Sequence, residues 1–265
     1  MSLVDDLFSK LKEAGQTAFM PFVTAGDPDL EFTGNLLKAL SEAGCHLVEL
    51  GFPYSDPIAD GPTIQASYTR ALGNKIKVED IFTMLDSVKD DLRMPVVAMV
   101  SFAIVHRYGV QEFLARAKTA GISGLIVPDL PVDESEELAS KCTSDGLSLI
   151  QLVTPTTSEE RAVQIADRST GFIYYVSIAG ITGARTDLPE ELASRLQWLK
   201  SKTDKPICVG FGVSKPEQAK MLSRHADGVI VGSAIVGRIG KAENSDEAMK
   251  DVVEFAKSML SGVAS

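Results

Sequence analysis

The sequence predicts a closed (β/α)₈ barrel that forms one domain over residues 1–265. Eight short and almost wholly apolar segments recur at regular intervals, with amphipathic stretches of helical spacing between them. Strands that are apolar throughout are typical of a parallel sheet buried on both faces. An open doubly wound sheet is the alternative. Eight successive units, without a Gly-x-Gly-x-x-Gly motif after the first strand, favour the barrel.

The elements follow one another along the whole chain, and no linker divides them. An extra helix is expected first, over residues 3–13, because Leu3, Leu7 and Leu11 share one helical face and Gly15 marks its end. The predicted strands are residues 18–23, 46–51, 96–101, 123–127, 147–153, 171–177, 206–210 and 228–232. The predicted helices are residues 31–43, 78–88, 110–120, 134–145, 158–167, 189–201, 215–223 and 246–260, with another short helical stretch after the eighth strand.

The composition limits the possible partners. A net charge of −10 argues against binding to nucleic acid or to an anionic membrane. The sequence has neither a cationic leader with an apolar core nor a run of 18 apolar residues. Three scattered cysteines (Cys45, Cys142 and Cys208) are typical of reduced thiols, so we expect a cytoplasmic protein. No metal is expected, since no His-x-x-x-His motif or His/Cys cluster occurs.

In a barrel of this kind the active site lies at the carboxyl ends of the strands and in the loops that follow them. Residues far apart in the sequence fall at such positions, and closure of the barrel would bring them together. They are Phe22, Glu49, Asp60, Val100, Asp129, Tyr174, Thr182, Phe211 and Ser233.

Glu49 is the most informative of these residues, because it interrupts the apolar run 46–51. Alternation along a strand places Glu49 on the same face as Leu47 and Gly51. Burial disfavours the charged form of a glutamate and raises its pKa, which suits a group that gives and takes protons near neutral pH. The alternative is a structural role, in which Glu49 pairs with a buried cation.

Two glycine-containing turns predict a phosphate site. Gly210-Phe211-Gly212 ends the seventh strand, and Gly232-Ser233-Ala234 ends the eighth before the short helical stretch. The loops after these two strands are the usual phosphate site of the fold, because glycine lets backbone N–H groups approach the anion. The alternative is a pair of tight turns without a ligand. A third stretch, residues 179–186, has the small residues and glycines of a mobile lid.

The run ELGFPYSDPIADGPTIQ at residues 49–65 closely resembles a signature of the tryptophan synthase alpha chain family. The resemblance continues at PFVTAGDP (21–28), PDLP (128–131), GITG (180–183), GFGV (210–213) and DGVIVGSA (227–234), and so covers essentially the whole chain. It implies cleavage of indole-3-glycerol phosphate to indole and glyceraldehyde 3-phosphate. No cofactor is implied for this chain, since pyridoxal phosphate in the family belongs to the beta chain, the expected partner in an α₂β₂ complex.

The resemblance also implies roles for individual residues. Glu49 would protonate C3 of the indole and assist removal of the proton from the adjacent hydroxyl, and Asp60 would accept the indole N–H. Thr182 would approach Asp60 from the closing loop. The ring pocket would be formed by Phe22, Val100 and Tyr174. The phosphate site would be formed by Gly183, Phe211, Gly212, Gly232 and Ser233.

One segment departs from the family pattern. After the third strand the family has Tyr-x-Asn-Pro, whereas this chain has FAIV at residues 102–105. The substitution leaves Glu49 and Asp60 in place, but it removes two polar groups near the surface expected to meet a beta chain. Three alternatives therefore stay open: a stand-alone lyase that releases free indole, a different phosphate-binding barrel such as a sugar-phosphate isomerase, and a non-catalytic subunit that only activates a partner.

Overall fold

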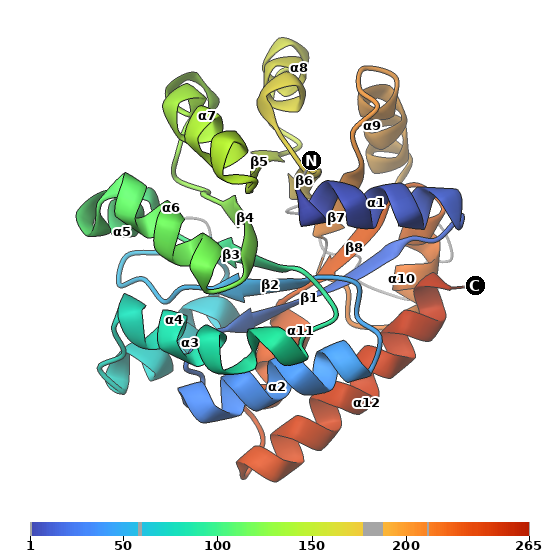
Figure 1. Cartoon of the computed structure of the whole chain (residues 1–265). Coiled ribbons are helices and arrows are strands. Elements are labelled where there is room, and N and C mark those ends of the chain that lie inside the picture. Colours follow the sequence, from blue (N-terminus) through green and yellow to red (C-terminus); the bar gives the residue numbers. More distant parts are fainter. Residues whose placement is uncertain (1, 58–59, 177–187, 211, 265) are drawn as a thin grey trace.

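The computed structural model describes residues 2–57, 60–176, 188–210 and 212–264, and it contains a closed parallel barrel (Figure 1). The strands pair in sequence order, and β8 pairs with β1 to close the barrel. They are β1 (Ala18–Thr24), β2 (Val48–Gly51), β3 (Val96–Met99), β4 (Ile122–Ile126), β5 (Ser148–Val153), β6 (Ile173–Val176), β7 (Ile207–Gly210) and β8 (Gly228–Val231). The predicted fold class is confirmed.

Helices surround the barrel, and α1 and the long α12 lie near the two ends of the chain (Figure 1). They are α1 (Leu3–Glu13), α2 (Leu30–Glu42), α3 (Pro62–Gly73), α4 (Val78–Val88), α5 (Phe102–Tyr108), α6 (Val110–Thr119), α7 (Glu136–Asp145), α8 (Glu159–Arg168), α9 (Glu190–Lys200), α10 (Pro216–Ser223), α11 (Ser233–Ile239) and α12 (Ser245–Val263). The 3₁₀ turns η1 (Lys89–Asp91) and η2 (Val132–Glu134) complete the described elements. No helix in the described ranges is long and apolar enough to span a membrane.

Alternation along the strands divides the buried side chains into two layers. Leu47 packs inside the barrel, whereas Val48 and Leu50 pack outward against the helices. Helix α1 closes one end of the inner layer, where Val4, Phe8 and Leu11 are buried and the Phe8 ring lies 5.5 Å from that of Phe172. The predicted extra helix is therefore present, and it leaves the other end of the barrel for the loops that follow the strands.

Two helices are present that the sequence pattern does not predict. The run at residues 49–65 has the prolines and glycine of a rigid loop, but α3 begins within it, at Pro62, with Ile64, Tyr68 and Ala71 on its buried face. Helix α5 begins shortly after the strand predicted at 96–101, which ends at Met99. The stretch after the eighth strand is helical as expected, as α11. Other element boundaries differ from the predicted ones by one or two residues at most ends.

Candidate active site

Glu49 lies on the inner face of β2, as alternation predicts. Its side chain is only 1 % exposed, and neither carboxyl oxygen has a hydrogen-bond partner within the part of the chain that the structure describes. The alternative role, pairing with a buried cation, is not observed among these residues. Burial, with a smaller contribution from the charge of Asp60, raises the pKa of Glu49 from 4.5 to about 8. Glu49 is therefore protonated at neutral pH.

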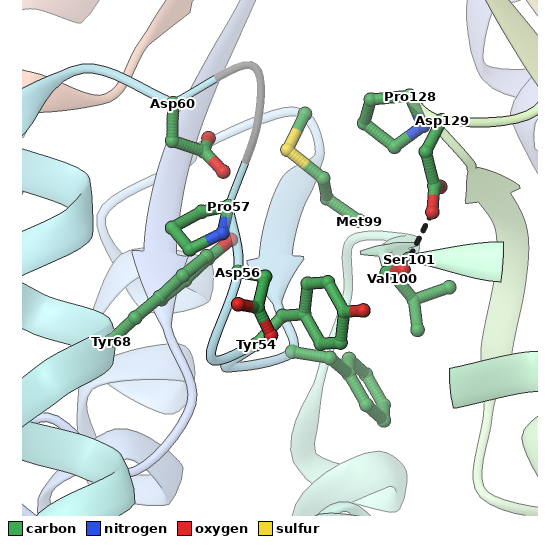
Figure 2. A pocket seen from close by; sticks show the side chains of 11 residues that line it. Tyr54, Asp56, Pro57, Asp60, Tyr68, Met99, Val100, Ser101, Pro128 and Asp129 are labelled. Carbon is green, nitrogen blue, oxygen red and sulfur yellow. Dashed lines mark hydrogen bonds between the residues drawn. The ribbon is translucent and has the colours of Figure 1, made fainter. Parts of the chain in front are cut away.

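Asp60 lies above the barrel in the loop between β2 and α3, where it is half-buried. Partial burial raises the pKa of this carboxyl above its usual value. The side chain points into a cavity of about 200 Å³ at the carboxyl ends of β2, β3 and β4 (Figure 2). The described residues that line this cavity are Phe52, Tyr54, Asp56, Pro57, Asp60, Tyr68, Met99, Val100, Ser101, Pro128 and Asp129.

The predicted ring-pocket residues surround these two carboxyls. Phe22 pairs with Glu49 across β1 and β2, and Val100 lines the cavity directly after β3. Tyr174 points inward from β6 and is 8 % exposed, and burial raises the pKa of its hydroxyl. The structure therefore brings Phe22, Val100 and Tyr174 to the same end of the barrel as Glu49 and Asp60.

Two glycines make room for the aromatic side chains. A Cβ atom at Gly51 would overlap the Phe22 ring, and one at Gly210 would lie 2.7 Å from Tyr174 Oη. Neither contact is possible for a real side chain, so each aromatic group lies against bare backbone at a strand end. The close approach of these two side chains therefore explains why β2 and β7 both end in glycine.

Tyr68 belongs to the site, although the sequence pattern does not predict it. It lies on the buried face of α3, is 4 % exposed and lines the cavity with Asp60. Its Oη lies 3.0 Å from the place where a Cβ of Gly51 would be, and so faces the strand that carries Glu49. The spacing of Ile64, Tyr68 and Ala71 is a helical signal that could have identified this position.

The Pro128–Asp129 loop contacts the start of α5. Asp129 accepts hydrogen bonds from Ser101 Oγ at 2.6 Å and from the backbone N–H of Phe102 at 2.8 Å, and Figure 2 shows the first of these. Asp129, predicted only as a strand-end candidate, thus caps α5 and forms one wall of the cavity. Phe102 and Ile104, the residues that depart from the family pattern, are half-buried and pack partly against the core.

The predicted phosphate residues lie at the far side of the barrel mouth. Gly212 is exposed with a φ of +56°, Gly232 precedes α11, and Ser233 is its exposed first residue. Ser233 lines a separate hollow of about 380 Å³, together with Ser214 and Lys241. Thr182, Gly183 and Phe211 lie outside the described residues, so their predicted roles stay predictions.

The charges of the cavity bear on what it can bind. Three of its lining residues are aspartates, and none of the described ones is a cation. A phosphate dianion would be repelled there, whereas an N–H donor or a developing positive charge would be stabilised. The described residues also contain no group of three or more His, Cys, Asp or Glu side chains that could hold a metal. The cavity therefore suits an uncharged part of a substrate that donates an N–H or gains positive charge during the reaction.

Comparisons with known proteins cover nearly the entire chain. The family described as "Tryptophan synthase alpha chain" matches residues 8–264. A tryptophan synthase alpha chain from Picosynechococcus sp. is 46% identical over 265 residues, which is 100% of both chains. The crystal structure of the tryptophan synthase alpha chain from Legionella pneumophila has a TM-score of 0.90 at 33% identity, covering 100% of this chain and 98% of the other. A chain from the tryptophan synthase a2b2 complex of Pyrococcus furiosus has a TM-score of 0.86 at 39% identity, covering 93% and 98%.

The raised pKa of Glu49 predicts how stability depends on pH. The unfolded chain loses this proton above a pH of about 4.5, whereas the folded chain keeps it up to about 8. The stability that protonated Glu49 contributes is thus fully present below pH 4.5 and is lost as the pH rises to 8. Glu49→Gln cannot titrate, so its unfolding free energy relative to wild type should rise by roughly 3 kcal/mol between pH 5 and pH 8.

Urea unfolding of both proteins at the two pH values measures this difference. Glu254→Gln is the matched control, because Glu254 is an exposed residue of α12 and stays in water in both states. If the unfolding free energies of wild type and Glu49→Gln change by the same amount between the two pH values, Glu49 ionises normally in the folded protein.

Proposed function

Because the chain belongs to the tryptophan synthase alpha chain family, we propose that it cleaves indole-3-glycerol phosphate with Glu49 and Asp60 as its catalytic groups. The products are indole and glyceraldehyde 3-phosphate. The observation that carries the proposal is a buried carboxyl without a partner among the described residues, with a second carboxyl acting on it from the loop above. We further propose that the chain functions as a single domain.

The first step needs an acid, and Glu49 is one at neutral pH. Its proton is transferred to C3 of the indole, which makes the ring cationic and leaves Glu49 ionised. The carboxylate then takes the proton of the hydroxyl next to the bond that breaks. As that oxygen becomes the aldehyde of glyceraldehyde 3-phosphate, the electron pair of the broken C–C bond returns to the ring. Glu49 ends protonated, as it began.

Asp60 stabilises the positive charge that builds up on the ring during these reaction steps. Its carboxylate accepts the indole N–H and stabilises the positive ring in a half-buried setting, where electrostatic interactions are stronger than in water. Phe22, Val100 and Tyr174 provide apolar contacts for the ring beside the two carboxyls. Thr182 is proposed to approach Asp60 when substrate is bound.

The phosphate group binds away from the aspartates. We propose that it lies against Gly212, Gly232 and the start of α11 at Ser233, together with Gly183 and Phe211. The first N–H groups of a helix lack intrahelical acceptors and favour an anion. An acidic cavity at one end and these backbone donors at the other would fix the direction in which the substrate lies.

We propose a tryptophan synthase beta chain as partner and an α₂β₂ complex as the assembly, which is the form in which the Pyrococcus furiosus protein was solved. The pyridoxal phosphate of the family belongs to that partner, and no cofactor is needed for the cleavage. Phe102 and Ile104 replace polar residues of the family pattern. Because both are half-buried, they add less exposed apolar surface than the sequence implies. Three free, buried cysteines agree with a cytoplasmic location.

The reaction is tested by incubating purified protein with indole-3-glycerol phosphate, with and without a beta chain, and quantifying indole. Glu49→Gln should lower kcat by about 10²–10⁴-fold while the substrate still binds, because an amide of similar size cannot move a proton. More than a tenth of wild-type turnover in this variant would remove Glu49 from its role. Indole release that is fast without the partner would favour a stand-alone lyase, and none under either condition would favour a non-catalytic subunit.

The phosphate site is tested by Ser233→Asp. This change puts a carboxylate at the start of α11, where like charges would repel a phosphate, so glycerol 3-phosphate should bind at least about tenfold more weakly. Ser261→Asp, at a position in α12, is the control. Calorimetry gives the affinity and circular dichroism checks the fold. Unchanged affinity in Ser233→Asp would place the phosphate elsewhere.

A further inference from the structure

A tyrosine hydroxyl that the reaction described above does not use faces the catalytic cavity. Figure 2 shows Tyr68 reaching from α3 toward the space into which Asp60 points. The ring packs with Phe22, Ile64 and Val236, and the side chain is almost completely buried. Its Oη lies 3.0 Å from the place where a Cβ of Gly51 would be, one inward position beyond Glu49 on β2. The hydroxyl therefore lies between the strand that carries Glu49 and the loop that carries Asp60.

This hydroxyl has no hydrogen-bond partner among residues 2–57, 60–176, 188–210 and 212–264. A phenol that a ligand buries normally finds one, because an unmade hydrogen bond leaves its desolvation cost uncompensated. Water in the cavity can be the hydrogen-bond partner of this hydroxyl as long as no substrate is bound. Once substrate fills the cavity, an acceptor must come from the substrate or from the site itself.

The backbone that carries Tyr68 is held in place. Ser67, the preceding residue, is hydrogen-bonded to Thr24 Oγ1 at 2.7 Å. Arg70, two residues later, donates to both carboxyl oxygens of buried Asp27 at 2.8 and 2.7 Å. These contacts fix α3 to the end of β1 and the loop after it, so the Tyr68 hydroxyl is presented from a rigid element.

The other groups facing the cavity are acids or weak acids, and none of the described ones supplies a strong donor to Asp60. Glu49 is protonated, but the reaction proposed above uses its proton, and Asp56 and Asp129 are acceptors of hydrogen bonds from Ser55 and Ser101. The titratable groups around Asp60 and Tyr68 are Glu49 from β2, Tyr174 from β6, Cys208 from β7, Tyr54 and Asp56 from the loop after β2 and Asp129 from the loop after β4. Tyr54 and Tyr68 are the two phenols that share the cavity with Asp60, and Tyr68 is the one that is almost completely buried, on a helix fixed to the end of β1.

We propose that Tyr68 is a positioning residue that donates its phenolic hydrogen to one oxygen of Asp60 while the other oxygen accepts the indole N–H. This inference rests on the proposed function and adds a residue to it. Hydrogen bonds of this kind are often open in a ligand-free site and close when substrate binds. The bond fixes the orientation of the carboxylate and favours its charged form, which is the form that stabilises the cationic ring.

The sign of the pH effect follows. A donor to the carboxylate opposes the burial that raises the pKa of Asp60. Without the Tyr68 hydroxyl the pKa of Asp60 stays higher, so less of the enzyme carries the required charge at mildly acidic pH. The acid limb of the kcat profile should therefore move to higher pH when the hydroxyl is removed.

The test is Tyr68→Phe, which keeps the ring and its packing and removes only the hydroxyl. We expect kcat to fall about 10–100-fold, the range for losing one hydrogen bond to a charged group. KM should change less than about threefold, and the acid limb should rise by about one pH unit. Tyr175→Phe is the matched control, since Tyr175 is equally buried but points outward from the barrel, and it should leave kcat, KM and the pH profile unchanged.

Two outcomes separate this inference from the proposed function. If wild type releases indole, Glu49→Gln does not, and Tyr68→Phe matches wild type in kcat and pH profile, then Tyr68 only packs and the inference is wrong. If wild type releases no indole with a beta chain present, the proposed function itself is wrong. A lower kcat with an unmoved acid limb also overturns the inference, because it shows that Tyr68 does not act through Asp60.

Discussion

The site depends on the burial of one carboxyl group that the described residues leave without a counter-charge. A glutamate inside an apolar barrel is stable only if it keeps its proton, and Glu49 does so because its pKa is raised to about 8. A lysine or arginine beside it would have formed an ion pair with it, as Arg70 does with buried Asp27 elsewhere in this chain. The difference between these two acids is the difference between a proton donor and a structural ion pair.

The geometry around Glu49 follows from closure of the barrel. A strand in a closed barrel points alternate side chains inward, so the position of Glu49 in β2 fixes both its burial and its distance from the mouth. The neighbouring inward position is Gly51, and the space it leaves is taken by the Phe22 ring and the Tyr68 hydroxyl. The acidic loop, the Phe22 ring and the end of β2 meet there because each lies toward or beyond the carboxyl end of a strand, and α3 packs Tyr68 against them.

Much of this could be predicted from the sequence, because it depends on periodicity. Apolar strands, their order and the inward face of β2 follow from local patterns, and so do Glu49 and the glycine turns. Tyr68 was missed because its helix begins in a proline-rich loop and its hydroxyl reaches the site beside Gly51, 17 positions away in sequence. The capping of α5 by Asp129 was missed for the same reason, since the two partners belong to different loops. Contacts between loops are set by tertiary packing, which a single sequence does not display.

The role of Glu49 as an acid can be measured directly from its protonation state in the folded protein. Carbon-13 NMR of protein labelled at the glutamate carboxyl carbon follows each residue, and Glu49→Gln identifies the relevant signal by its loss. We expect the Glu49 signal to titrate with a midpoint near pH 8. A midpoint near 4.5, the value for a glutamate in water, would show that Glu49 is ionised at neutral pH and cannot start the reaction as an acid.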